Sequence, residues 1–181
     1  MNTVTALVLV DIQNDYFDGG LWPLHDMDAA AEVAASVLAH ARSRGWPVFH
    51  VFHHGAETAP FFRPDTAGAE IHPSVTPIAG EAMILKHRPN SFLNTDLHRL
   101  LQTKGVTHLR LIGAMSQMCI DATARAARDL GYTVEIIAEA CASRAINWNG
   151  TEVPAPLVHA AFMAALDGTY ATVYPTLDDA A

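Results

Sequence analysis

The sequence predicts an α/β protein with a mostly parallel sheet covered by helices on both faces. Short, unbroken apolar runs alternate along the chain with longer segments whose apolar residues recur at helical spacing. This alternation is typical of βαβ units, in which a helix carries the chain back to begin the next parallel strand. The chain has 181 residues, 50% hydrophobic and 17% charged, which suits a single domain over residues 1–181 with a sizeable core.

The first half of the chain contains three predicted strands and one helix. Ala6–Val10 is an unbroken apolar run, as expected of a strand buried on both faces. Asp28–Arg44 is rich in alanine with helical spacing of its apolar residues, and Gly45 favours an end to that helix. Two further apolar runs, Val48–Phe52 and Met83–Leu85, are predicted as the second and third strands.

The second half continues the alternation. Asp96–Thr103 and Cys119–Leu130 are helical by composition, and a glycine follows each of them closely. Pro154–Leu166 is predicted as a further helix, because proline is tolerated in a first helical turn. The remaining apolar runs, predicted as strands, are Leu109–Ile112, Thr133–Ile137 and Ala171–Tyr174.

One stretch breaks the alternation. Residues 54–80 contain His, Gly, Pro and Thr with little periodicity, so we expect a long excursion between the second and third strands. Excursions of that length in compact domains are usually functional or disordered.

Composition and charge exclude several classes of protein. Eleven basic against nineteen acidic residues give a net charge of −8, and the sequence has no Lys/Arg run, which argues against nucleic acid and membrane as partners. Two cysteines cannot build a disulfide framework. The first residues lack the basic segment and cleavage site of a secretion signal, and their apolar run is too short to span a bilayer. We therefore expect a reduced, cytoplasmic protein.

Three residues with reactive side chains fall at or just beyond predicted strand ends: Asp11, Lys86 and Cys119. Ligands of open α/β sheets bind outside the carboxyl ends of the strands, so parallel strands would bring these distant residues to one edge. A cysteine that opens a helix has its thiol pKa lowered by the free N–H groups, and a nearby ammonium acts in the same direction. An aspartate could then serve as general base and acid.

Each of these residues also has a structural interpretation. Cys119 could be an inert buried residue, Asp11 a helix-capping or loop residue, and Lys86 a solvent-exposed cation. Residue type and spacing leave both interpretations open.

Three long segments resemble the isochorismatase-like cysteine hydrolases, in the order in which that family carries them. ALVLVDIQNDYFDGGLWP (Ala6–Pro23) resembles the opening strand of the family, and GEAMILKHRPNSFLNTDL (Gly80–Leu97) the segment with its lysine. GAMSQMCIDATARAARDLGY (Gly113–Tyr132) is similar to the segment with the nucleophile. The resemblance covers nearly the whole chain.

The resemblance implies a Rossmann-like three-layer sandwich with a six-stranded parallel sheet, and a catalytic triad of Asp11, Lys86 and Cys119. It also implies an acyl-enzyme mechanism on C–N bonds without a cofactor. A cis peptide bond would join Ala114 to Met115 and turn the N–H groups of Met115 and Cys119 towards the substrate carbonyl oxygen.

Departures from subfamily patterns narrow the expected chemistry. Isochorismatases proper lack the cysteine, so Cys119 favours hydrolysis of an amide, lactam or carbamoyl group. Nicotinamidases carry an Asp-x-His metal motif after the second strand, whereas this sequence has VFHVFHHGAE (Val48–Glu57) without the aspartate. His50, His53 and His54 could bind Zn²⁺, but a hydrogen-bonding substrate wall or an exposed loop is the expectation, with no metal.

Aromatic residues supply the candidate pocket walls: Phe17, Trp22, Phe62 and Phe92. The alternative is that some of them pack in the core. The segment Phe61–Val75 resembles the loop that closes the pocket in the non-nicotinamidase branch of the family. Gln13 is a further candidate for substrate binding, and Gln13 and Asn14 are expected to fix the first loop through hydrogen bonds.

The sequence thus favours a cysteine hydrolase for the C–N bond of a small molecule. Two alternatives remain: a metal-dependent nicotinamidase-like amidase, and a non-catalytic thiol-based redox sensor in which Cys141 would resolve an oxidised Cys119. The resemblance suggests a homodimer or homotetramer. Pro154–Leu166 could be an interface helix or a fully buried core helix.

Overall fold

The computed structural model describes residues 3–180 and contains a six-stranded sheet in which all neighbouring strands run parallel. The spatial order is β3-β2-β1-β4-β5-β8. The strands are β1 (Thr5–Val10), β2 (Val48–His53), β3 (Ala82–Lys86), β4 (His108–Ala114), β5 (Thr133–Ala142) and β8 (Thr172–Tyr174). The predicted strands are therefore present, each within a few residues of its expected bounds except β5, which runs five residues further.

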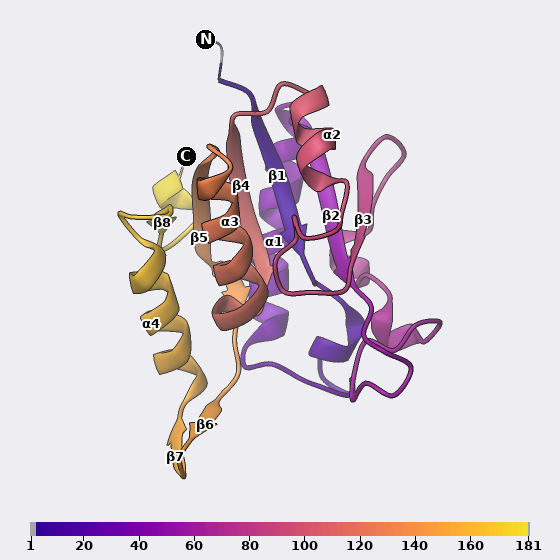
Figure 1. Cartoon of the computed structure of the whole chain (residues 1–181), viewed down its shortest axis with the longest axis vertical. Coiled ribbons are helices and arrows are strands. Elements are labelled where there is room, and N and C mark those ends of the chain that lie inside the picture. The colour runs from indigo at the N-terminus through magenta and orange to yellow at the C-terminus, as the bar shows by residue number, and fades with distance from the viewer. Residues whose placement is uncertain (1–2, 181) are drawn as a thin grey trace.

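Helices cover both faces of this sheet, which makes three layers (Figure 1). The helices are α1 (Met27–Ser43), α2 (Leu97–Thr103), α3 (Asp121–Asp129) and α4 (Ala155–Leu166). Side chains of α1 belong to one apolar core cluster, and those of α2, α3 and α4 belong to a second cluster on the opposite face. The predicted α/β architecture is confirmed. Within residues 3–180, no helix combines the length and apolar character needed to cross a bilayer.

Two local features were not predicted. A two-stranded antiparallel hairpin, β6 (Ile146–Trp148) with β7 (Thr151–Val153), projects from one end of the molecule (Figure 1). The helical segment expected from Cys119 instead begins as one π-helical turn, Ser116–Ile120, which continues directly into α3. The hairpin strands are only three residues long, too short to show a clear period.

The strand order reverses between β1 and β4, which lie side by side although β2 and β3 follow β1 in the chain. In this doubly wound arrangement, such a reversal opens a crevice at the carboxyl ends of the strands. Val10 and Gly113 are direct partners there. A Cβ atom on Gly113 would collide with the Val10 carbonyl oxygen, and Gly113 has φ +122°, so only glycine fits this close approach.

The excursion after β2 is ordered and docks on the loop that follows β1. It contains two 3₁₀ turns, η2 (Ala67–Ala69) and η3 (Pro73–Val75), and the first loop contains η1 (Asn14–Tyr16). Asp15 is buried beneath the excursion and accepts a hydrogen bond from the Phe62 N–H at 2.6 Å. The two segments together form one wall at the carboxyl edge of the sheet.

Candidate active site

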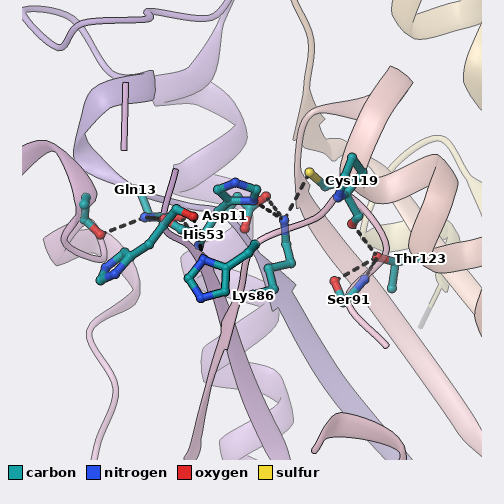
Figure 2. A network of polar contacts seen from close by, with 11 residues as sticks. Asp11, Gln13, His53, Lys86, Ser91, Cys119 and Thr123 are labelled. Atoms are coloured by element: carbon teal, nitrogen blue, oxygen red, sulfur yellow. Dashed lines mark hydrogen bonds and ion pairs between the residues drawn. The ribbon is translucent and has the colours of Figure 1, made fainter. Parts of the chain in front are cut away.

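Asp11, Lys86 and Cys119 meet at the carboxyl edge of the sheet (Figure 2). Asp11 is the residue directly after β1, Lys86 is the last residue of β3, and Cys119 lies in the π-helical turn after β4. Lys86 Nζ is 2.7 Å from Asp11 Oδ2 and 3.2 Å from Cys119 Sγ. The ammonium thus bridges a carboxylate and a thiol that are far apart in the sequence.

This centre is removed from solvent. The exposed fractions are 0% for Asp11, 1% for Lys86 and 5% for Cys119. An isolated buried charge is very costly, whereas a buried ammonium paired with a carboxylate is tolerated. Asp11 Oδ1 is buried and has no hydrogen-bond partner within residues 3–180. One carboxylate oxygen therefore holds Lys86, and the other is free to accept a proton.

Burial raises the pKa of the Cys119 thiol well above its usual range, and the Asp11 carboxylate acts in the same direction. The Lys86 ammonium lowers that pKa, but by less. The expectation of a lowered thiol pKa was therefore wrong. Sequence reasoning counted the helix end and the cation but did not count the cost of charging a thiol beside a buried carboxylate.

Lys86 itself remains charged. Burial lowers the pKa of its ammonium, but Asp11 and then Cys119 outweigh that effect, and the net pKa is raised. The resting centre is thus a carboxylate, an ammonium and a protonated thiol, and a base must remove the thiol proton before Cys119 can act as a nucleophile.

His53 is a third neighbour of the ammonium, with its Nδ1 atom 3.1 Å from Lys86 Nζ. It is the last residue of β2 and pairs directly with Lys86 across the sheet. Burial, followed by the Lys86 charge, lowers the pKa of His53 to about 4. From the sequence, this histidine was considered as a metal ligand, as part of a substrate wall or as part of an exposed loop. The pairing register that brings it to Lys86 is decided by the sheet.

His50 in the same strand and His54 directly after it have other partners. His50 is buried, and its Nε2 is 2.8 Å from Glu81 Oε2. The His54 ring packs edge-on against Phe52. Among residues 3–180, no group of three or more His, Cys, Asp or Glu side chains is arranged to hold a metal ion.

Gln13 is fully buried and connects the end of β2 to the excursion (Figure 2). Its amide nitrogen donates to the carbonyls of His53 and Ala69, and its amide oxygen accepts from the His53 N–H. Asn14 donates to the Ala67 carbonyl at 2.7 Å. These bonds join the first loop to the excursion, and the Gln13 side chain is occupied by backbone groups rather than directed at open space.

Hydrogen bonds between two residues with hydroxyl side chains connect the loop after β3 to α3. The sequence analysis did not identify these two residues. Thr123 Oγ1 accepts from the Ser91 N–H at 3.1 Å and lies 2.8 Å from Ser91 Oγ. Both residues are buried. Lys86 precedes this loop and Cys119 precedes α3. The contact therefore fixes the positions of these two segments of the site relative to each other (Figure 2).

Two of the candidate wall aromatics belong to one aromatic group, in which Phe62 lies near His53 and Trp22 is joined to it through Phe61. Phe62 is buried, with its ring centroid 4.5 Å from Tyr16 and 6.2 Å from His53. Trp22 stacks on Phe61 at 4.9 Å, and the Arg144 guanidinium lies 4.4 Å from the Trp22 ring. Aromatic side chains of the first loop and of the excursion thus pack together.

The other two candidate aromatics contact different partners. Phe17 stacks on His72 with a centroid separation of 3.6 Å, and both line a cavity of about 370 Å³. Phe92 stacks on Tyr132 at 6.0 Å and packs against the core cluster shared by α2 and α3. Packing is the role that these contacts indicate for Phe92.

The peptide bond between Ala114 and Met115 is cis. It joins the last residue of β4 to the residue that precedes the π-helical turn. Cys141 lies near the end of β5, where it pairs with Gly113, and it is buried without a disulfide partner. Burial raises the pKa of the Cys141 thiol to about 12.

The fold and this edge of the sheet define a doubly wound α/β enzyme whose ionisable and nucleophilic groups gather where the strand order reverses. The model of the isochorismatase domain matches residues 5–171, and the chain belongs to the isochorismatase family. It is a hydrolase.

Individual proteins agree with this assignment. The chain is 51% identical over 173 residues to the isochorismatase family protein YddQ of Bacillus subtilis, covering 95% of this chain and 96% of YddQ. It is 37% identical over 134 residues to a streptothricin hydrolase of Streptomyces noursei, covering 72% of this chain and 47% of that protein. The crystal structure of an isochorismatase hydrolase from Oleispira antarctica superposes with a TM-score of 0.95 at 48% identity, over 99% and 97% of the two chains.

Proposed function

We propose that this protein is a cysteine hydrolase that cleaves the C–N bond of a small amide, lactam or carbamoyl compound through a thioester. The observation that carries the proposal is the bridge from Lys86 Nζ to Asp11 Oδ2 and Cys119 Sγ, at 2.7 and 3.2 Å. Similarity to a streptothricin hydrolase supports hydrolysis of a small molecule. Residues 3–180 contain no grouped metal ligands that would favour a metal-dependent route.

In the proposed first step, Asp11 takes the thiol proton through Oδ1, the buried oxygen without a hydrogen-bond partner. The Cys119 thiolate then attacks the carbonyl carbon of the substrate. Asp11 becomes neutral in this step, so the thiolate is the only anion of the centre, and Lys86 stays charged throughout and stabilises it.

The tetrahedral intermediate needs donors for its oxyanion, and the N–H groups of Met115 and Cys119 are the proposed donors. Collapse of the intermediate breaks the C–N bond, and the proton held by Asp11 passes to the leaving nitrogen. A water molecule, deprotonated by Asp11, then hydrolyses the thioester and restores the thiol. In this scheme Phe62, which lies near His53, forms one wall of the substrate pocket, and Trp22 extends that wall through Phe61.

The experiment is hydrolysis of an amide panel by wild type, Cys119→Ala and the control Cys141→Ala. The panel contains nicotinamide, carbamoyl-amino acids, ureides and cyclic lactams, with release of ammonia or amine as the signal. For any compound that wild type hydrolyses, Cys119→Ala should lose on the order of 10⁴-fold in kcat, and Cys141→Ala should keep most of the activity. Mass spectrometry should detect an acyl group on Cys119 during turnover. Undiminished turnover by Cys119→Ala would refute the mechanism.

We also propose that the chain forms a homodimer or homotetramer and works in the cytoplasm. Helix α4 is not a fully buried core helix, because Leu157 is 61% exposed, and Trp148 on the hairpin is 80% exposed. Large exposed apolar side chains of this kind favour an interface between copies. Light scattering coupled to size-exclusion chromatography should give a mass two or four times 19.5 kDa, and Leu157→Glu should reduce it. The two free cysteines are compatible with a reducing compartment.

A further inference from the structure

The contact between His53 and Lys86 determines which nitrogen of the imidazole carries a proton. An ammonium group has three N–H donors and no acceptor. Lys86 Nζ has three neighbours at hydrogen-bond distance, which are Asp11 Oδ2, Cys119 Sγ and His53 Nδ1 at 3.1 Å. Nδ1 must therefore accept, so the ring is neutral and its proton sits on Nε2.

The backbone of this histidine is held on both sides by one side chain. The His53 N–H donates to Gln13 Oε1 at 2.8 Å, and Gln13 Nε2 donates to the His53 carbonyl at 2.9 Å. Gln13 is in turn attached to the excursion through the Ala69 carbonyl at 2.7 Å. The backbone that carries the ring is therefore held in place at the end of β2, where His53 pairs with Lys86 in the sheet.

The charges around the ring and its burial favour the neutral form. Lys86, His87 and His54 lower the pKa of His53, whereas Asp11 raises it, and burial lowers it more than any of these charges. With a pKa of about 4, the ring is an acceptor throughout the range from pH 5 upwards.

We propose that His53 is a positioning residue. It accepts a hydrogen bond from the third N–H of Lys86 and thereby fixes the ammonium between Asp11 and Cys119. The role deepens the proposed function and rests on it, because it concerns the group that stabilises the thiolate. A lysine side chain has four rotatable bonds, and three hydrogen-bond partners restrict the position of Nζ more than two do. A neutral acceptor supplies the third partner without adding a charge that would compete with Asp11.

Nitrogen NMR of uniformly ¹⁵N-labelled wild type tests the protonation state without any substrate. Two-bond ¹H–¹⁵N correlations of the imidazole should show protonated Nε2 and unprotonated, hydrogen-bonded Nδ1 at pH 7, with titration only near pH 4. His53→Asn identifies the His53 signals by their loss. A proton on Nδ1, or titration of His53 between pH 6 and 7, would overturn the proposal.

Alkylation of Cys119 by iodoacetamide, measured by peptide mass spectrometry, tests the effect on the thiol. His53→Leu should react about tenfold more slowly at fixed pH, as expected if the thiol pKa rises by about one unit when Lys86 is no longer held. His53→Asn keeps an amide oxygen that can accept from Lys86, so its rate should lie closer to wild type. His54→Leu is the matched control and should be unchanged.

Two results would contradict the role of His53: wild-type rates for His53→Leu between pH 6 and 9, or equal losses for His53→Leu and His53→Asn. Thermal unfolding of each variant separates loss of the fold from loss of reactivity. If wild type hydrolyses no compound of the amide panel, the proposed function fails, yet the NMR and alkylation results still decide whether His53 positions Lys86.

Discussion

Asp11 and Lys86 form an ion pair that is fully removed from water, and each charge depends on the other. Their side chains are both 0% exposed. A buried pair contributes little net stability, but loss of one partner strands the other charge in a medium of low dielectric constant. The thiol beside them is kept protonated by the same burial. At the scale of the residue, the reactivity of Cys119 is thus controlled by the balance between one carboxylate and one ammonium.

Asp11→Asn should therefore lower the free energy of unfolding by about 3–5 kcal/mol, because the Lys86 ammonium is left buried without its counter-ion. It should also speed alkylation of Cys119 at fixed pH, since the carboxylate that raises the thiol pKa is gone while the Lys86 ammonium, which lowers it, remains. Urea denaturation at pH 7 measures the first effect. The matched control is the double substitution Asp11→Leu with Lys86→Met, which removes both charges and should be more stable than Asp11→Asn although inactive. Equal stability of Asp11→Asn and wild type would contradict a charged pair in the folded protein.

At the scale of the element, the site depends on contacts that attach loops to strand ends. Gln13 joins the first loop, the end of β2 and η2, and Thr123 joins α3 to the loop after β3. Such contacts satisfy buried backbone groups that have no partner in a strand or helix. The excursion of residues 54–80 is therefore an ordered wall rather than a disordered loop.

Gln13→Met should lower the free energy of unfolding by about 2–4 kcal/mol, because it keeps the side-chain volume but leaves buried backbone groups of His53 and Ala69 unpaired. Asn14→Ala is the control in the same loop. It removes a single exposed hydrogen bond to Ala67 and should cost about 1 kcal/mol or less. Denaturant titration of both variants gives the comparison, and similar losses for the two would contradict the anchoring role of Gln13.

At the scale of the whole molecule, several buried ionisable groups make stability depend on pH in the same direction. Burial lowers the pKa of His50 and His53 below the usual value of 6.5, to about 4 for His53. The unfolded chain therefore binds protons at these residues before the folded protein does. Burial raises the pKa of Glu81, but its hydrogen bond with Arg42 and further bonds outweigh burial and hold the value at about 2.

We expect the free energy of unfolding to be nearly constant from pH 8 to 6.5 and to decrease as the pH falls from 6.5 to 4, where the histidines of the unfolded chain become protonated. The stabilisation that Glu81 contributes is present above pH 4.5 and is lost as the pH falls from 4.5 towards 2. Urea titrations at half-unit intervals from pH 8 to 4 measure the first of these effects. A profile that is flat or rises on acidification would contradict neutral, buried histidines in the folded state.

The periodicity of the chain was sufficient to predict the α/β class, the parallel strands and the helices on both faces. The central strand β1 is an unbroken apolar run that is buried on both faces, and shorter apolar stretches mark the other strands of the main sheet. The positions of Asp11, Lys86 and Cys119 at strand ends are also local, so their gathering at one edge could be predicted. The resemblance of three ordered segments, from Ala6 to Tyr132, correctly indicated the family.

Tertiary structure alone decided the environment of those side chains. The direction of the Cys119 pKa shift depends on how deeply the thiol is buried and on which charges lie within reach, and neither is encoded in neighbouring residues. The contact of His53 with Lys86 arises from the pairing register of β2 with β3. Hydrogen bonds of Gln13 reach across 40 and 56 positions of the chain. The sequence by itself determined the elements and their reactive ends, whereas burial and register, which depend on contacts between distant segments, determined the chemistry available to them.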